Sequence, residues 1–211
     1  MKLLRKLSLA ASIALALSSS SAFANLIVNG GFETSSDPTV TPPGWTNVGH
    51  SDGVIPYSLF GPVAYEGLNY YDLGGFGDAS GPSGDGIEQA VATVAGTTYQ
   101  LDFGLSSENL FGDEELTVCF NGSACTAFAL FVDGSGVFQK PFTTKSLSYF
   151  ATSALTNISF IATIGGGAND PMIDKVIFDV AGTTPVPEPG TLALLGLGLA
   201  GLGAGRRRVV A

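Results

Sequence analysis

Thr98-Tyr-Gln-Leu-Asp-Phe-Gly-Leu105 is the clearest structural signal in this chain of 211 residues. Its large apolar side chains recur at every second position and alternate with Gln100, Asp102 and Gly104. A period of two predicts a β-strand that presents one face to a hydrophobic core. We therefore expect its apolar face to be buried together with matching positions of other strands, namely Leu101, Phe103, Leu116, Val118, Ile158, Phe160 and Ile177.

The same alternation recurs on both sides of this stretch. Strands are predicted at 26–28, 86–91, 98–105, 116–120, 127–132, 156–164 and 172–180, with weaker signals at 54–60, 70–73 and 138–150. Turn-forming residues separate them, and no segment between Asn25 and Thr184 sustains a helical period. Eight to ten short strands of this kind predict an all-β fold, an antiparallel β-sandwich. The irregular stretches 34–54 and 74–86 are expected to be surface loops.

The N-terminus has the pattern of a secretory signal peptide over residues 1–24. Three basic residues precede an apolar run from Leu7 to Leu17, and small residues, Ala22 and Ala24, stand at the third and first positions before a cleavage point. This arrangement predicts a signal helix that is removed, so that the mature protein begins at Asn25. The alternative is an uncleaved membrane anchor.

The C-terminus carries a second apolar segment, within a tail of residues 185–211. Val186, Pro187, Glu188 and Pro189 precede an apolar run over 190–205, which ends at Arg206, Arg207 and Arg208. As a helix its last 15 residues would span only about 22 Å of a hydrocarbon core about 30 Å thick, which predicts a short transmembrane helix. The arginines should stay cytoplasmic, with the body outside. A buried core helix is the alternative, although six glycines disfavour it.

This order of Pro-Glu-Pro stretch, short apolar helix and arginine cluster resembles the PEP-CTERM sorting signal of exported bacterial proteins. The resemblance covers residues 186–208. It implies a Gram-negative source, passage through the inner membrane with the body periplasmic, and processing by an exosortase-like membrane enzyme that recognises the Pro-Glu-Pro stretch. It also implies a destination at the cell surface or in the extracellular polysaccharide of a biofilm.

Between the two signals lies one predicted domain, residues 25–184, long enough to bury a core. It contains three lysines against 17 acidic side chains, a net charge of −14. Such a surface excludes nucleic acid and anionic membranes as partners. It favours divalent cations.

The two cysteines flank a predicted hairpin loop, Asn121-Gly-Ser123. A three-residue loop places Cys119 and Cys125 opposite each other on paired strands, which predicts a disulfide in an oxidising compartment. The alternative is a pair of reduced cysteines packed as small apolar residues. A metal site or a catalytic thiol here is disfavoured, because the only histidine, His50, is distant in sequence.

Four segments of the body resemble galactose-binding-like jelly-roll modules of the carbohydrate-binding type. They are Asn25-Leu-Ile-Val-Asn-Gly-Gly-Phe-Glu33 with Pro43-Gly-Trp45, Ile87-Glu-Gln-Ala-Val91, Val94 to Phe103, and Ile173-Asp-Lys-Val176. The resemblance implies a structural calcium where the first and last strands meet, held by Glu33 and Asp174 with oxygens from Asn29 and Gly31. Lys175 departs from the pattern, because such modules often have a second acidic residue there. Without calcium, residues 29–31 would be a turn and Asp174 a strand-edge aspartate.

Aromatic side chains in or beside the irregular stretches suggest a sugar site. Trp45, Tyr70 and Tyr71 are the candidates, with Tyr57 and Phe76 beside them, because flat rings stack on sugar C–H faces. For Trp45, packing in the core is the alternative.

Catalysis has little support, because Glu108 and the run Asp113 to Glu115 are expected to form a solvated face and no catalytic motif is present. The sequence thus predicts a non-catalytic surface or matrix protein that binds polysaccharide. A structural protein without a ligand site and a secreted glycosidase are the alternatives.

Overall fold

The computed structural model describes residues 25–37, 39–49, 53–56, 63–74, 84–108, 112–135, 140–164 and 170–182. The chain separates into two compact units, of which one is Asn25–Ala181 and the other combines Met1–Ala24 with Gly182–Ala211. The predicted signal peptide and the tail with its predicted transmembrane helix lie outside the described residues. The described part contains no helix that is long and apolar enough to span a membrane.

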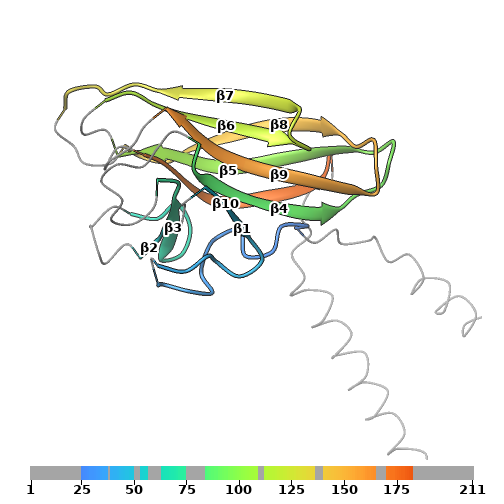
Figure 1. Ribbon diagram of the computed structural model, residues 1–211, viewed down its shortest axis with the longest axis horizontal. Helices are drawn as coiled ribbons and strands as arrows, with labels where there is room; N and C mark the ends of the chain where they lie inside the picture. Colours follow the sequence, from blue (N-terminus) through green and yellow to red (C-terminus); the bar gives the residue numbers. More distant parts are fainter. Residues whose placement is uncertain are drawn as a thin grey trace, which may run out of the picture. The chain divides into compact units, whose positions relative to one another are not determined.

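The Asn25–Ala181 unit is a sandwich of two antiparallel five-stranded sheets (Figure 1). Sheet A has the order β1-β4-β9-β6-β7, with β1 (Thr46–Val48), β4 (Gly86–Ala92), β6 (Glu114–Phe120), β7 (Ala124–Leu130) and β9 (Leu155–Ile164). Sheet B has the order β2-β3-β10-β5-β8, with β2 (Gly53–Pro56), β3 (Asn69–Asp72), β5 (Thr98–Ser107), β8 (Thr143–Phe150) and β10 (Pro171–Val180). The predicted all-β sandwich is confirmed.

The hydrophobic core lies between the sheets. Strand β5 contributes Tyr99, Leu101, Phe103 and Leu105, each at most 2% exposed, and these meet Leu116, Val118, Ile158 and Phe160 of sheet A. Six of the seven residues predicted to be buried are therefore buried, because the alternation along β5, β6 and β9 survives in the folded sheets.

The prediction for Ile177 is wrong, and the reason is a β-bulge. Asp174 pairs with Gly104 and Ile177 with Asp102, so β10 has one residue more than β5 over this interval. Lys175 sits in the bulge with a φ of 51°. The extra residue reverses the alternation, and Val176 and Phe178 enter the core while Ile177 is only half-buried.

Three further differences concern strand boundaries. Residues 26–28 form no strand; they are held by a bond from the Leu26 N–H to the Phe178 carbonyl and by the Gln89 amide, which bonds both backbone groups of Val28. Strand β7 begins at Ala124, three residues earlier than predicted, because the hairpin loop is tight. Strand β1 lies inside the expected loop 34–54, paired with β4.

The hairpin between β6 and β7 carries the predicted disulfide. Cys119 and Cys125 face each other in the register, and their sulfur atoms are bonded. Asn121 and Gly122 both have positive φ, the backbone that a tight hairpin turn requires.

Candidate functional site

The three aromatic residues predicted to bind sugar belong to the interior, so that prediction is corrected. Trp45 is 7% exposed, Tyr70 is 1% exposed and Tyr71 is fully buried. The Trp45 ring packs against Phe32 and Phe160, and its indole N–H donates to the Asn29 carbonyl at 3.1 Å. A large ring with its N–H paired gains more from burial than from exposure, which confirms the core alternative for Trp45. Tyr57 and Phe76 lie outside the described residues.

Tyr70 and Tyr71 project to opposite sides of β3, as neighbours on a strand must. Tyr71 packs against Phe32 in the main core, whereas Tyr70 joins Met172 and Phe142 in a smaller cluster. Neither ring offers a face to a sugar.

The structure brings Glu33 and Asp174 to the same loop, residues 65–69, although the two are far apart in sequence. Glu33 Oε1 accepts the N–H groups of Leu68 and Asn69, each at 2.8 Å. Asp174 accepts the N–H of Glu66 at 2.9 Å and that of Lys175 at 2.6 Å. The two carboxylates thus hold one loop by hydrogen bonds, one from near the start of the domain's sequence and one from near its end.

Burial sets the electrostatics of this pair. Asp174 is fully buried, and loss of hydration raises its pKa to about 7, although hydrogen bonds from the loop lower it and the charge of Glu33 adds to the rise. Lys175 does not neutralise Asp174, since its Nζ pairs with Glu66 at 2.9 Å. A cation at the two carboxylates would remove this cost.

The fit of this place to calcium is partial. Asn29 bonds elsewhere, since its Oδ1 accepts the Thr34 N–H and its Nδ2 donates to the Pro43 carbonyl. Across the described part of the chain, no three His, Cys, Asp or Glu side chains form a metal-binding group. Glu33 and Asp174 could therefore hold calcium only if backbone carbonyls, such as that of Gly31, supply the remaining oxygens.

A groove of about 440 Å³ crosses the outer face of sheet B. We call it the sheet B groove, and it is lined by Tyr65, Gln100, Asp102, Phe103, Thr144, Ser146, Lys175 and Ile177. Strands β5, β8 and β10 supply all of these residues except Tyr65. Tyr65 lies in the loop before β3, and its ring packs against Gly104 of β5. Pairing of β5 with both β8 and β10 fixes their spacing.

Tyr65 forms a fixed aromatic surface at this groove and is 41% exposed. Its ring lies on Gly104, where an added Cβ would be 2.8 Å from the ring carbon Cδ1. Its hydroxyl is 2.6 Å from that of Thr144, and the Lys175 Nζ lies 5.7 Å from the ring centroid. Glycine at position 104 is thus what lets the ring approach the strand this closely.

Polar groups beside the ring are held in place. Gln100 Nε2 donates to both oxygens of Asp102 at 3.0 Å, and the Ser146 hydroxyl also donates to Asp102. A flat ring beside fixed carboxylate, amide and hydroxyl groups can stack on a sugar and bond its hydroxyls.

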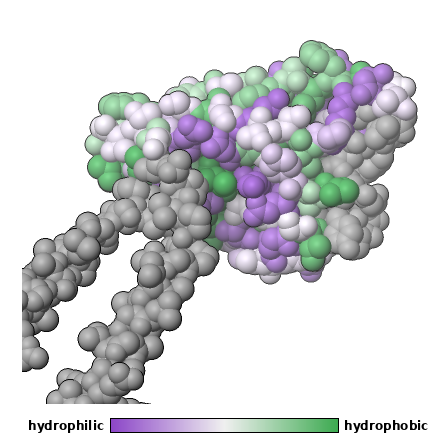
Figure 2. Space-filling model, turned by 180° about the vertical axis from the view of Figure 1, so that it is seen from behind, coloured by the Kyte–Doolittle hydropathy of each residue, from purple (hydrophilic) through white to green (hydrophobic). Residues whose placement is uncertain are grey.

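Figure 2 shows hydrophilic and apolar residues interspersed over one side of the domain, without a single large apolar patch.

Glu108 and Glu114 do not belong to a solvated face, contrary to expectation. They are 7% and 2% exposed, and they lie at one end of the sandwich near Asp72 and Asp170, which are also buried. Burial, and then the charges of Glu108 and Asp170, raise the pKa of Asp72 well above its ordinary value. Burial and Asp170 raise the pKa of Glu108 to about 7. Since these carboxyl groups are enclosed, they form an internal acidic cluster.

Residues 185–208 match the model of the PEP-CTERM protein-sorting motif. The predicted sorting signal is therefore present, and it indicates an exported protein. No curated protein matches the chain in sequence.

Solved structures similar to this chain include carbohydrate-binding modules. The xylan-binding domain CBM22-1 of Paenibacillus barcinonensis Xyn10C is 13% identical, with a TM-score of 0.50, over 79% of this chain and all of that domain. The module TmCBM61, solved with β-1,4-galactotriose, is 18% identical, with a TM-score of 0.49, over 74% of this chain and 97% of the module. An arabinose-bound α-L-arabinofuranosidase, MgGH51, is 15% identical, with a TM-score of 0.53, over 76% of this chain and 27% of the enzyme. At these identities the likeness concerns the fold, a jelly-roll sandwich.

Sequence reasoning missed the residues of the sheet B groove. Tyr65 lies in a loop with no strand pattern, and Lys175 stood out only as a departure from an acidic position. Alternation does place Gln100 and Asp102 on the outer face of β5, so these two groove residues could have been found from the sequence. Which outer-face positions gather around a ring depends on the pairing of β8 and β10 with β5.

Proposed function

We propose that this protein is an exported, non-catalytic polysaccharide-binding protein that holds a glycan chain in the sheet B groove. The observation that carries the proposal is the Tyr65 ring, packed closely against Gly104 beside the fixed polar groups of Asp102 and Gln100. A pyranose ring needs this combination of an apolar face and lateral hydrogen bonds.

The sorting motif supports an extracellular location for this function. An exosortase-like enzyme would process the tail after the body has reached the periplasm, and the domain would then reside at the cell surface or in extracellular polysaccharide, as in a biofilm. The net charge of −14 supports a polysaccharide over nucleic acid as the partner.

The carboxyl groups support a binding role over hydrolysis. Glycoside hydrolysis uses two carboxyl groups on either side of the scissile bond. Among the described residues that line the groove, Asp102 is the only one with a carboxylate. Release of reducing sugar from a retained polysaccharide would instead favour the glycosidase alternative.

A structural calcium ion at Glu33 and Asp174 is part of the proposal. Glu33, near the start of the domain's sequence, and Asp174, near its end, meet at one loop, and a hard cation there would offset the repulsion between the two carboxylates. The ion would strengthen the tie between the loop that carries Tyr65 and strand β10.

The test is native gel electrophoresis of the exported protein in gels that contain xylan, β-1,4-galactan or hydroxyethylcellulose. We expect wild type to be retarded by at least one of them. Tyr65→Ala should lower the apparent affinity for the polysaccharide about tenfold, because the stacking surface is lost, whereas Tyr65→Phe should keep most of that affinity. Val94→Ala removes a side chain that is 65% exposed in a turn and serves as the matched control.

Two outcomes would contradict the proposal. If no polysaccharide retards wild type, the protein is better explained as a structural matrix protein without a ligand site. If Tyr65→Ala is retarded like wild type while its melting temperature is unchanged, the groove does not bind the glycan.

A further inference from the structure

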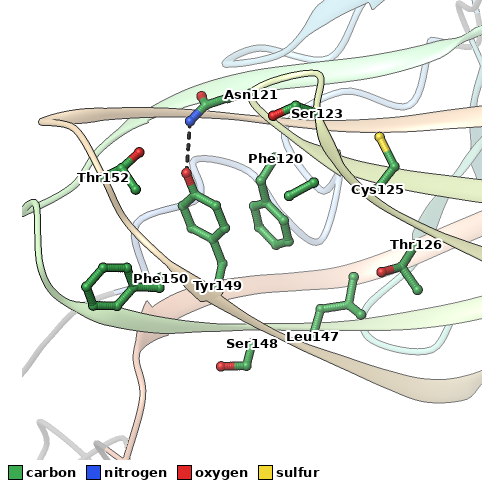
Figure 3. Close-up of a pocket in the computed structure, with 11 residues that line it drawn as sticks. Phe120, Asn121, Ser123, Cys125, Thr126, Leu147, Ser148, Tyr149, Phe150 and Thr152 are labelled. Atoms are coloured by element: carbon green, nitrogen blue, oxygen red, sulfur yellow. Dashed lines mark hydrogen bonds between the residues drawn. The ribbon is translucent and has the colours of Figure 1, made fainter.

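A second hollow lies on the flank of the sandwich, where the two sheets end. Strands β7 and β8 are the edge strands of sheets A and B on this side, so within the described residues no strand closes the gap between them. The hollow has a volume of about 560 Å³ and lies between the tip of the β6–β7 hairpin and the end of β8 (Figure 3). We call it the flank cleft. It shares no lining residue with the sheet B groove.

The floor of the flank cleft is a rigid aromatic pair. The rings of Phe120 and Tyr149 are stacked, with centroids 4.4 Å apart and planes 12° from parallel. Figure 3 shows the Tyr149 hydroxyl pointing to Asn121, whose Nδ2 donates to it at 2.9 Å. Asn121 is itself tied to Asn157 of β9 by two hydrogen bonds of 2.8 Å. The ring and the amide are therefore held in place before any ligand arrives.

An exposed aromatic ring lies at the rim of the cleft. Phe150 of β8 is 59% exposed, whereas the phenylalanines of β5, β6, β9 and β10 are buried. Phe150 pairs with the exposed Thr98 and Tyr149 with the buried Tyr99, so Tyr149 projects toward the core and Phe150 toward the outer face of sheet B. Phe150 therefore belongs to the rim of the cleft and not to its floor. In Figure 3 Thr152 lies above it, while Thr126 and Leu147 lie at the other end. An exposed ring next to hydroxyl groups can stack on a flat apolar face and bond polar groups at its rim.

The charge of the cleft selects the ligand class. None of the eleven residues that line it is charged, although the domain as a whole carries −14. Anionic and cationic ligands would find no partner of opposite charge there. A neutral sugar residue, with C–H faces and several hydroxyls, matches rings, hydroxyls and an amide.

We infer that the flank cleft is a second carbohydrate site, which takes a neutral sugar residue independently of the sheet B groove. The inference rests on the proposed function and extends it, because a domain with two sites can hold two segments of polysaccharide at once. Binding at both sites raises the overall affinity without any new contact and allows one domain to join two chains.

The test uses the exported protein and the polysaccharide that retards wild type most strongly among xylan, β-1,4-galactan and hydroxyethylcellulose. We expect Phe150→Ala to weaken retardation about three- to tenfold and the double variant with Tyr65→Ala to abolish it, because the sites act independently. Calorimetry with a trisaccharide of that polysaccharide should give two sites per wild-type chain and one per Phe150→Ala chain. Leu155→Ala is the matched control, since Leu155 is 57% exposed against 59% for Phe150.

The outcomes separate this inference from the proposed function. If Phe150→Ala matches wild type in both measurements while Tyr65→Ala is weakened, the second site is wrong and the groove stands. If Tyr65→Ala matches wild type while Phe150→Ala loses retardation, the groove is wrong and the cleft is the glycan site. Absence of any retardation of wild type overturns both.

Discussion

A single residue, Lys175, changes which side chains of β10 enter the core. Its positive φ forms the bulge of β10, and the bulge reverses which side chains of the strand enter the core. The same bulge leaves Lys175 on the outer face, where it pairs with Glu66 and approaches the Tyr65 ring. A position that departs from the usual acidic pattern thereby becomes part of the sheet B groove.

The proposed calcium can be tested at a single residue, Glu33. We expect calcium to raise the melting temperature of wild type by several degrees over EDTA, because the ion neutralises Glu33 and the buried Asp174. Glu33→Gln should lose most of this response. Its carbonyl can still accept the two N–H groups that bond Oε1, so the variant should remain as stable as wild type in EDTA. Melting temperatures by differential scanning calorimetry provide the measurement.

Glu66→Gln is the control for that experiment, because it removes a neighbouring carboxylate that pairs with Lys175 and should leave the calcium response intact. A wild-type melting temperature that is equal in calcium and in EDTA would exclude a structural ion at Glu33.

The strand ends at one end of the sandwich collect carboxyl groups from four elements. Asp72 ends β3, Glu108 follows β5, Glu114 begins β6 and Asp170 precedes β10. Each is at least 92% buried. Lost hydration, and then the charges of neighbouring carboxylates, raise the pKa values of Asp72 and Glu108. This part of the fold therefore gives the protein a pH-dependent stability.

We predict that stability in EDTA falls as the pH rises from about 4.5 to about 7. Glu108 keeps its proton up to a pKa of about 7 in the folded protein, whereas in the unfolded chain it loses the proton near its ordinary value of 4.5. The unfolded state thus binds fewer protons over this range, and the free energy of unfolding decreases, by up to about 3 kcal/mol for this group. Glu108→Gln should flatten the decrease and raise stability at pH 7.

Urea denaturation at half-unit pH intervals gives the measurement. Asp113→Asn, which changes an exposed carboxylate nearby, should retain the wild-type slope. A wild-type stability that rises between pH 4.5 and 7 would show that the cluster is ionised in the folded protein.

At the level of the whole molecule, the sorting motif and the sandwich have separate tasks. The motif at residues 185–208 concerns delivery, and the domain carries both hollows that could meet a glycan. Under the proposed function, release from the membrane would let the domain act wherever its polysaccharide lies.

We predict that release depends on the Pro-Glu-Pro stretch. In a host with an exosortase, replacement of Pro187, Glu188 and Pro189 by alanine should leave full-length protein in the membrane. Replacement of Arg206, Arg207 and Arg208 by serine should let part of the population pass through uncut, since the arginines hold the cytoplasmic side of a short helix. The mass of the extracellular form identifies its C-terminus. Secreted wild type that retains Arg208 would refute the sorting role.

Local patterns were sufficient to predict the sandwich, the disulfide and the sorting motif. The alternation of Leu101 and Phe103 marks the core face of a strand regardless of its neighbours, and a tight turn at Asn121-Gly122 brings Cys119 and Cys125 together by geometry within the hairpin. Each of these features depends on residues close in sequence, so the chain alone carries the information.

The positions of the binding surfaces depended on contacts between distant segments. Tyr65 lies in the groove because its loop crosses Gly104, and Trp45 is buried because Phe32 and Phe160 surround it. The burial of Glu108 likewise follows from the meeting of strand ends far apart in the chain, and the reversed face of Val176 from a bulge opposite β5. An aromatic or acidic side chain has the same local sequence pattern in a core as on a surface, so only strand pairing across the two sheets separates the two cases.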